Sequence, residues 1–526
     1  MDSETTPAAS GGPPAAEHRW WTLLAVCGAT FMLLVDITIV QVALPTMQRD
    51  LHANFTDLQW VISAYALTLS ALLLTQGSLA DRFGRKRVFI AGVVVFTLSS
   101  LACALATSAP VLVGARAVQG VGGAGMFATG LALIGQDFQG RERGTAIAVW
   151  GSTVGGAVAI GPLIGGALTS GLGWQWIFYV NLPIGVLTVA VAALRMVNVA
   201  DPDAKRLDLG GLVTFSGSLF LLVLGLTRGN DDGWTSTTIL GLFAGAAVLM
   251  AAFVLVEQAQ RRPMFDLSLF RNPSFVGVSI GTFGLGAGMF AIFPYLTFYL
   301  QNLLGMSPLQ GGLRLLPMTI FAFVVPVVMR MFGEHIGPGV TLGTGLMLSA
   351  GGLALMHLVT VTSGWTALLP GMVVGGIGVG IANPAIARIA LGVVEPQRSG
   401  MASGINNTFR LGGVATGVAA LGAIFQDRLS SSLHSSLGTV PAQLPQAVAA
   451  GGLRAAARLS GGQAAVVSAA RRAFVSGIDD ILVVGAVCVV VGGLFAALVR
   501  SRDLRLQVAQ VSRPAAEPEP VPEIAG

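Results

Sequence analysis

Long apolar runs, separated by short polar or Gly/Pro-containing segments, repeat along almost the whole chain. A helix that crosses a bilayer needs about 20 consecutive, mostly apolar residues. Fourteen runs are close to or above this length. They cover residues 21–45, 58–80, 88–107, 110–135, 145–169, 176–197, 209–227, 238–257, 274–301, 309–331, 339–361, 366–390, 399–425 and 478–499. The pattern predicts an all-α integral membrane protein with fourteen transmembrane helices.

The composition supports a protein that faces lipid rather than water. Hydrophobic residues make up 53% of the 526-residue chain and charged residues only 10%, whereas a soluble domain contains about 25% charged residues. So few charges would not cover a water-soluble globule of this size. The 70 glycines fit the same interpretation, because small residues let helices approach closely in a bilayer.

The distribution of basic residues predicts the orientation of these helices. If both termini are cytoplasmic, most basic residues fall in inner loops, and the short outer loops contain only Arg49 and Arg228. This positive-inside pattern explains the net charge of +5 without nucleic acid as a partner. Arg replaces Lys almost everywhere, which is typical of a GC-rich bacterium. We therefore expect a multi-pass protein of the bacterial plasma membrane with cytoplasmic tails, residues 1–20 and 500–526.

Residues that usually carry enzyme chemistry are scarce and scattered. Cys27, Cys103 and Cys488 each lie inside an apolar run and lack the spacing of metal ligands. The 5 histidines are unpaired, and the chain has no nucleotide-binding loop and no HExxH motif. We therefore expect no metal, no cofactor and no enzyme activity.

The loop after the second run, residues 77–87, combines four cations with one carboxylate. Basic residues alone would serve as a cytoplasmic anchor of the topology. An anchor needs neither Asp81 nor the two glycines, Gly77 and Gly84. A carboxylate here can cap a neighbouring helix, and glycine permits a tight turn. The loop therefore indicates a specific structural role.

This loop, GSLADRFGRKR, resembles the GxLaDrxGrkr signature of the major facilitator superfamily. The resemblance implies a loop that latches the two halves together on the cytoplasmic side when the transporter faces outward. The implied latch residues are Gly77, Asp81, Arg82, Gly84 and Arg85. Asp137, at the inner end of the fourth run, is by the same resemblance a partner of Arg85.

Three further stretches resemble the drug:proton antiporter branch of that superfamily, whose members have fourteen transmembrane helices. Residues 34–45, LVDITIVQVALP, are similar to LDxTIVNVALP, with Gln41 in place of the usual Asn. Residues 116–123, RAVQGVGG, are similar to RxxQGxGga, and residues 161–166, GPLIGG, to GPxxGG. These motifs cover most of the first two hundred residues in the order that the branch shows.

The resemblance implies the major facilitator fold, with two six-helix bundles and two inserted helices. The N-terminal bundle would span 21–200, the inserted pair 201–272 and the C-terminal bundle 273–499, and we expect a monomer. The outer segment 426–477 either carries short amphipathic helices or forms a poorly ordered loop. The second-half counterpart of the latch loop, 330–338, has lost most of its cations, so a second latch is not supported.

Asp36 is the only acidic residue that we place near the middle of a run. At 1.5 Å per residue it lies about 15 Å below the outer surface, and Arg116 in the fourth run lies about 12 Å deep. A charge at the bilayer centre costs at least about 2.5–3.5 kcal/mol, so it should face a cavity or a partner. Two interpretations remain open: Asp36 binds the transported proton beside Arg116, or the two form a structural ion pair.

Other polar and aromatic residues inside the runs are candidates for a substrate cavity. Gln119, one turn from Arg116, either contacts substrate or supports that arginine. Arg410 lies one turn from Asn406 and Asn407, and it either lines the cavity or hydrogen-bonds to carbonyl groups. The aromatic candidates, which could equally be packing residues, are Phe293, Tyr295 and Tyr299.

The fifth run contains the antiporter motif Gly161, Pro162, Gly165 and Gly166 near its outer end. Pro162 interrupts backbone hydrogen bonding, and the glycines permit close approach. By resemblance this segment packs against the tenth run, where a tight outer seal would limit back-leak of an exported compound. The alternative is an ordinary proline kink.

Together these features predict a proton-coupled efflux pump in which two bundles rock about a central site. A single central acid favours a neutral, monocationic, zwitterionic or lipid-like compound over a divalent cation. Two alternatives share the pattern: a lipid or metabolite transporter on the same scaffold, and a membrane sensor that does not transport.

Overall fold

The computed structural model describes residues 16–138, 140–198, 208–260, 265–331, 337–394, 399–438, 440–441 and 443–500. In these ranges the regular elements are helices. Fourteen of them, counting broken helices as one, are long and apolar enough to cross a membrane. The predicted class and number of helices are therefore confirmed.

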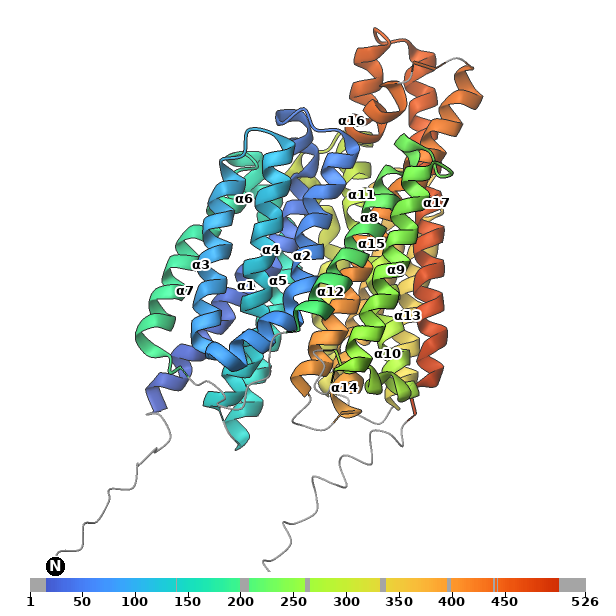
Figure 1. The fold of residues 1–526 in the computed structure, drawn as a ribbon. Coiled ribbons are helices and arrows are strands. Elements are labelled where there is room, and N and C mark those ends of the chain that lie inside the picture. Colours follow the sequence, from blue (N-terminus) through green and yellow to red (C-terminus); the bar gives the residue numbers. More distant parts are fainter. Residues whose placement is uncertain are drawn as a thin grey trace, which may run out of the picture.

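The N-terminal half forms one bundle (Figure 1). Its helices are α1 (Ala16–Asp50), α2 (Phe55–Phe83), α3 (Arg85–Ala104), α4 (Ala109–Asp137), α5 (Gly140–Gly171), α6 (Trp176–Tyr179) and α7 (Asn181–Arg195). Local chemistry sets some of these ends. Asn54 and Asp57 form a reciprocal capping box at the start of α2, which satisfies backbone N–H groups that would otherwise lack partners.

Two linker helices, α8 (Leu209–Asp232) and α9 (Thr237–Ala259), follow the first bundle and pack against each other. α8 also lies against α2 and α15, so the pair covers one side of the junction between the halves. At its inner end, Phe215, Phe253 and Phe265 join the linker helices to the segment that leads into the second bundle.

The C-terminal half forms the second bundle. Its elements are η1 (Leu267–Arg271), α10 (Pro273–Leu285), η2 (Gly286–Phe290), α11 (Phe293–Phe298), η3 (Tyr299–Leu303), α12 (Pro308–Met331), α13 (Pro338–Met356), η4 (Trp365–Leu368), α14 (Leu369–Gly392), α15 (Ser399–Leu437), α16 (Gln443–Leu459), α17 (Ala464–Phe495) and η6 (Ala496–Leu498). α10 to η3 form one broken membrane-spanning helix. Its two π-helical turns are a feature often found at functional sites.

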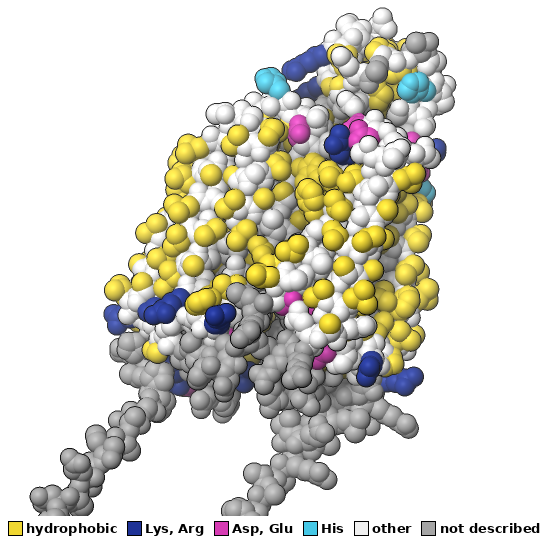
Figure 2. All heavy atoms as spheres, viewed as in Figure 1, with side chains coloured by type: hydrophobic (Ala, Val, Ile, Leu, Met, Phe, Trp, Pro, Cys, Tyr) yellow, Lys and Arg dark blue, Asp and Glu magenta, His cyan; other side chains and the backbone are white. Residues whose placement is uncertain are grey.

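α1 begins and α17 ends at the same end of the bundle, which we call the inner end (Figure 1). On the face shown in Figure 2, hydrophobic side chains are spread over the middle of the molecule, and charged side chains gather mainly towards its two ends. This surface suits a protein whose middle contacts lipid, because charges are costly at the bilayer centre.

The outer segment 426–477 is helical in its described residues. α15 continues to Leu437 and α17 starts at Ala464, so both helices extend well beyond the bounds predicted from hydropathy. Between them, α16 lies over the outer end of the bundle (Figure 1). Asn302 Nδ2 donates to Ala450 O at 2.6 Å and ties α16 to η3. Of the two interpretations, the helical one is therefore observed.

The two halves meet along two long seams, and at the outer end Gln301 Nε2 of η3 also donates to Val42 O of α1 at 2.8 Å. In the first, Gln59 Nε2 of α2 donates to Val418 O of α15 at 3.0 Å. In the second, Thr319 Oγ1 of α12 donates to Ala159 O of α5 at 3.0 Å. At the inner end of α5, residues 142–145 are exposed. The contact between α5 and α12 therefore lies in the outer half of α5.

An aromatic cluster closes the outer end between the halves. Phe55 of the N-terminal half lies 5.6–6.2 Å, between ring centroids, from three aromatic rings of the C-terminal half. These rings belong to Tyr295, Phe298 and Phe425. With the exposed inner end of α5, this closed outer end indicates an inward-facing arrangement.

Candidate functional site

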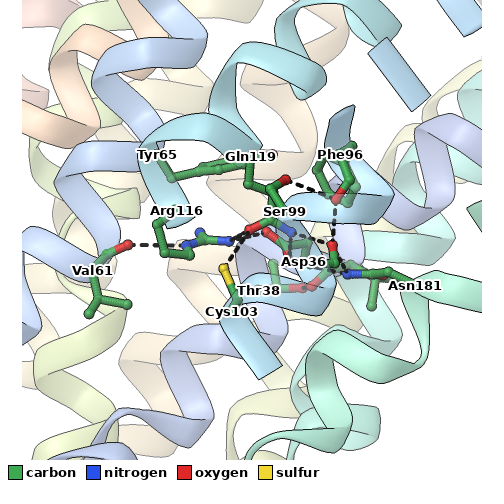
Figure 3. Close-up of polar contacts among 12 residues, drawn as sticks. Asp36, Thr38, Val61, Tyr65, Phe96, Ser99, Cys103, Arg116, Gln119 and Asn181 are labelled. Atoms are coloured by element: carbon green, nitrogen blue, oxygen red, sulfur yellow. Dashed lines mark hydrogen bonds and ion pairs between the residues drawn. The ribbon is translucent and has the colours of Figure 1, made fainter. Parts of the chain in front are cut away.

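The centre of the N-terminal bundle contains an ion pair between α1 and α4 (Figure 3). Arg116 Nη1 lies 2.5 Å from Asp36 Oδ2. The exposed fraction is 0% for the Asp36 side chain and 2% for that of Arg116. The two residues that we expected to be partners from their depth are therefore in direct contact and shielded from water.

Neutral donors complete the surroundings of Asp36. Gln119 Nε2 donates to Asp36 Oδ1 at 3.0 Å, and Asn181 Nδ2 donates to the same oxygen at 3.4 Å. Gln119 Nε2 also contacts Ser100 Oγ at 2.8 Å, and its Oε1 accepts from Arg116 Nη1 at 2.6 Å. In this conformation Gln119 supports the pair, which is one of the two roles that we considered.

Sequence reasoning missed Asn181 and Ser100. Asn181 is the first residue of α7, two residues before Pro183, and nothing in the sequence around it indicates that its side chain reaches Asp36. Ser100 is one of several serines in the third apolar run. Their contacts depend on how α3 and α7 are rotated against α1, which hydropathy alone does not reveal.

Arg116 also reaches α2. Its Nε donates to Val61 O at 3.2 Å, and its Cζ lies 4.1 Å from the centre of the Tyr65 ring. An arginine over an aromatic face gains a cation–π attraction. The pair is thus enclosed by helices of its own bundle and faces a partner rather than an open cavity. Removing either charge would leave the other buried and uncompensated, which costs about 3–5 kcal/mol.

The polar residues predicted on α15 separate into two groups. Asn406 is buried and donates to Thr282 Oγ1 of α10 at 3.0 Å, so in this structure it joins helices of one bundle. Arg410 Nη2 donates to Asn407 Oδ1 at 2.7 Å, and Asn407 Nδ2 donates to Ser403 O. Both of the latter side chains are partly exposed.

The predicted aromatic lining is buried at the outer end of the molecule. Tyr295 Oη donates to Val418 O at 2.6 Å, and Tyr299 Oη donates to Ser363 O at 3.4 Å. Phe293 is 7% exposed and belongs to the hydrophobic core. In this conformation Tyr295 serves the outer closure, and none of the three lines an open space.

The expected Arg85–Asp137 pair is not formed. Arg85 Nη2 instead contacts Asp81 Oδ1 at 3.4 Å, and Arg85 Nη1 donates to Ala132 O at 3.3 Å. Asp137 accepts from Thr22 Oγ1 at 2.5 Å. The pair was implied by resemblance for the outward-facing state, so its absence from this inward-facing arrangement leaves that prediction open. Asp81 lies at the end of α2 and Arg85 at the start of α3, and the turn at Gly84 brings their side chains together.

Other latch residues also remain within the N-terminal half. Gly84 has φ of 98° at the junction of α2 and α3, a conformation that glycine adopts readily. Arg82 Cζ lies 5.4 Å from the ring centre of Phe83. A Cβ added to Gly77 would meet nothing within 4 Å, so close packing does not explain this glycine in the inward-facing arrangement.

The antiporter motif on α5 faces two helices. Cβ atoms on Gly161 and Gly165 would lie 1.8 Å from Thr38 Oγ1 and 2.8 Å from Ile39 Cγ1, both on α1. A Cβ on Gly166 would lie 2.7 Å from Pro308 O of α12. The predicted contact with the tenth membrane-spanning helix is thus made by the outer part of the motif. Pro162 shares it, since its carbonyl lies against Gly312 of α12.

Comparisons with known proteins agree with these features. Residues 26–418 match the Major Facilitator Superfamily. The chain is 34% identical over 442 residues to a Streptomyces glaucescens protein named tetracenomycin C resistance and export protein, covering 82% of this chain and 81% of that one. It is 36% identical over 421 residues to multidrug resistance protein Stp of Mycobacterium tuberculosis, covering 79% and 78%.

Among solved structures, a bacterial homolog of the human lysosomal transporter Spinster, in an inward-facing and unoccupied conformation, has a similar fold. The TM-score is 0.63 at 16% identity, over 94% of this chain and 99% of that one. Sequence match, relatives and fold agree with the motifs and the two-bundle architecture. This chain therefore belongs to the Major Facilitator Superfamily of membrane transporters.

Proposed function

We propose that this chain exports small amphipathic compounds, antibiotics among them, in exchange for protons that enter the cell. The observation that carries the proposal is Asp36, an unexposed carboxylate held by an arginine and two amides at the centre of a bundle. The similarity to an antibiotic-export protein and a multidrug-resistance protein supports the direction and the class of substrate.

The proton would act by changing the charge balance of the pair. An ionised Asp36 attracts Arg116, whereas a protonated Asp36 leaves the guanidinium as a buried cation without a counter-charge. Such a cation is strongly disfavoured in a low-dielectric interior. Arg116 also contacts Val61 and Tyr65 of α2. Since α2 packs against α15 of the other half, a rearrangement at the pair would reach a seam between the bundles.

The inward-facing arrangement would be one of two end states of an alternating-access cycle. Opening the outer end requires the aromatic cluster around Phe55 to separate and the inner end of α5 to approach α12. We propose that Asp81 and Arg85 then exchange their mutual contact for partners in the C-terminal half. Their present contacts within one half fit a latch that is disengaged.

The remaining features follow from the same proposal. The inner end would be cytoplasmic in a bacterial plasma membrane, because basic residues favour that side. The proton gradient would supply the energy, without a cofactor or an enzymatic step.

A transport assay tests the proposal. A pump-deficient bacterium that expresses the chain is screened for antibiotic resistance, and transport of each hit is measured in everted vesicles with and without an uncoupler. We expect the uncoupler and Asp36→Asn each to abolish uphill transport. Asp232→Asn, which removes a carboxylate from a surface pair with Arg228, is the matched control. Uphill transport at the native rate by Asp36→Asn would overturn the proton-coupling role.

A further inference from the structure

One polar stripe on α15 faces away from the neighbours that the structure assigns to that helix. One face of α15 packs on α2, where Gly404 meets Leu74 and Thr408 meets Ser70. A second face packs on the linker helix α8, where Gly412 meets Leu219. A third face packs on α10 and η2, where Gly413 and Gly417 meet the backbones of Phe283 and Ala287. At about 100° per residue, Ser403, Asn407 and Arg410 fall on the remaining face. This face lies opposite the linker helix and is directed towards the region between the two halves.

Burial along the stripe agrees with this placement. Ser403, Asn407, Arg410 and Val414 are all partly exposed, whereas Gly413, Ala415 and Thr408 on other faces are buried. Arg410 is eleven residues from the start of α15, or about 16 Å along the helix axis. The hydrocarbon core is about 30 Å thick. The guanidinium therefore belongs to a helix segment near the middle of the bilayer and is accessible from its interior side.

The charge of Arg410 is not balanced by the described part of the chain. Its side chain has one hydrogen-bond partner there, Asn407 Oδ1 at 2.7 Å. By contrast, Arg116 is paired with Asp36 at 2.5 Å. A guanidinium has five N–H donors in a planar fork that fits a carboxylate or a similar oxygen pair. Most of those of Arg410 remain available.

We propose that Arg410, positioned by Asn407, binds an acidic group of the exported compound, such as a carboxylate or an ionised phenol. This inference rests on the proposed export function and specifies its substrate class. It departs from the expectation of a neutral, monocationic, zwitterionic or lipid-like compound, which was argued from the number of central acids and did not consider Arg410. Asp36 is already neutralised by Arg116, whereas Arg410 on the other half has no counter-charge among the described residues.

The same chemistry could be supplied by an anionic lipid headgroup, so the experiment includes both sources. Full-length protein is placed in nanodiscs of zwitterionic lipid. The probes are two fluorescent aromatic acids, anthracene carboxylate and pyrene butyrate, each paired with its primary amide. Acid and amide have nearly the same shape, so their affinity difference reports recognition of the charge.

We expect wild-type protein to bind each acid more tightly than its amide. Arg410→Gln should weaken acid binding roughly 10- to 100-fold, the range of a charge-assisted hydrogen bond, and leave amide binding nearly unchanged. Unchanged amide binding also shows that the variant is folded. Arg410→Lys, which keeps the charge but not the fork, should retain part of the preference.

Arg314→Gln is the matched control. Arg314 donates to Gln310 O and lies over the Trp365 ring near the outer end, so its loss should not change the acid preference. The inference is overturned if wild-type protein binds acid and amide equally, or if Arg410→Gln keeps the preference. Phosphatidylglycerol, added to the nanodiscs, tests the anionic lipid as the alternative ligand. The inference is also overturned if this lipid abolishes acid binding and vesicles do not export the acid, because Arg410 then binds a lipid headgroup.

Failure of this inference can be told apart from failure of the proposed function. If Asp36→Asn stops uphill transport but Arg410→Gln leaves the acid preference intact, only the substrate class is wrong. If the acid preference depends on Arg410 but transport is insensitive to the uncoupler and to Asp36→Asn, only proton coupling is wrong.

Discussion

A double-mutant cycle on Asp36 and Arg116 would separate the two roles of this pair. Both side chains are fully or almost fully buried and in contact at 2.5 Å. Asp36→Asn removes one charge and leaves a buried guanidinium, and Arg116→Gln leaves a buried carboxylate. Each single variant should lose about 3–5 kcal/mol of stability. The other donors to Asp36, Gln119 and Asn181, should place the carboxylate-retaining variant towards the lower end of that range.

The double variant should be more stable than the sum of the single losses predicts. Two neutral amides can hydrogen-bond to each other, and neither charge is left unpaired, so we expect a coupling energy of about 2–3 kcal/mol. Unfolding of the detergent-purified proteins by a chemical denaturant, followed by circular dichroism, measures each loss. Additive losses, with no coupling energy, would refute the reasoning about uncompensated charge.

Transport by the same double variant decides between the two interpretations. If the pair binds the transported proton, a folded double variant has no group that titrates at this place and should not drive uphill export. If the pair is structural, export should recover together with stability. Wild-type uphill export by the double variant would therefore assign the proton-binding role to another residue.

Three further outcomes follow from close contacts in the structure. Gly166→Val should lower export strongly, because its Cβ would clash with α12 when the outer end is closed, whereas Gly156→Val, with nothing within 4 Å of its Cβ, should leave export nearly unchanged. Gly84→Ala should lose about 1–2 kcal/mol of stability in denaturant unfolding, because of its positive φ, and Gly77→Ala should lose less. Asn302→Ala should increase amide hydrogen exchange in α16, because it removes a hydrogen bond that ties this helix to the bundle; unchanged exchange would show that packing alone holds α16.

Depth in the membrane could be read from the sequence to within about one helical turn. Helix rise is constant at 1.5 Å per residue, so counting from the ends of the apolar runs placed Asp36 and Arg116 at similar levels. Two opposite charges at one level inside a bilayer are expected to pair, since each is costly alone. The structure shows this contact.

Depth in the membrane did not predict which residues at the same depth contact each other. Arg85 and Asp137 lie at the same inner end, yet Arg85 contacts Asp81, and Asp137 contacts Thr22. The same limitation hid Asn181, which completes the surroundings of Asp36. Hydropathy also missed the outer parts of the last two membrane-spanning helices, because α15 ends at Leu437 rather than 425 and α17 starts at Ala464 rather than 478.

The sequence by itself determined that the chain is helical, crosses a membrane and carries the motifs of one transporter superfamily, because a bilayer requires long apolar helices whose length and charge bias are one-dimensional properties. Only the tertiary structure decided which face of each helix meets which neighbour. Rotation about a helix axis is set by side-chain packing between distant segments. That rotation directs Asp36 into its own bundle and leaves Arg410 facing the region between the halves.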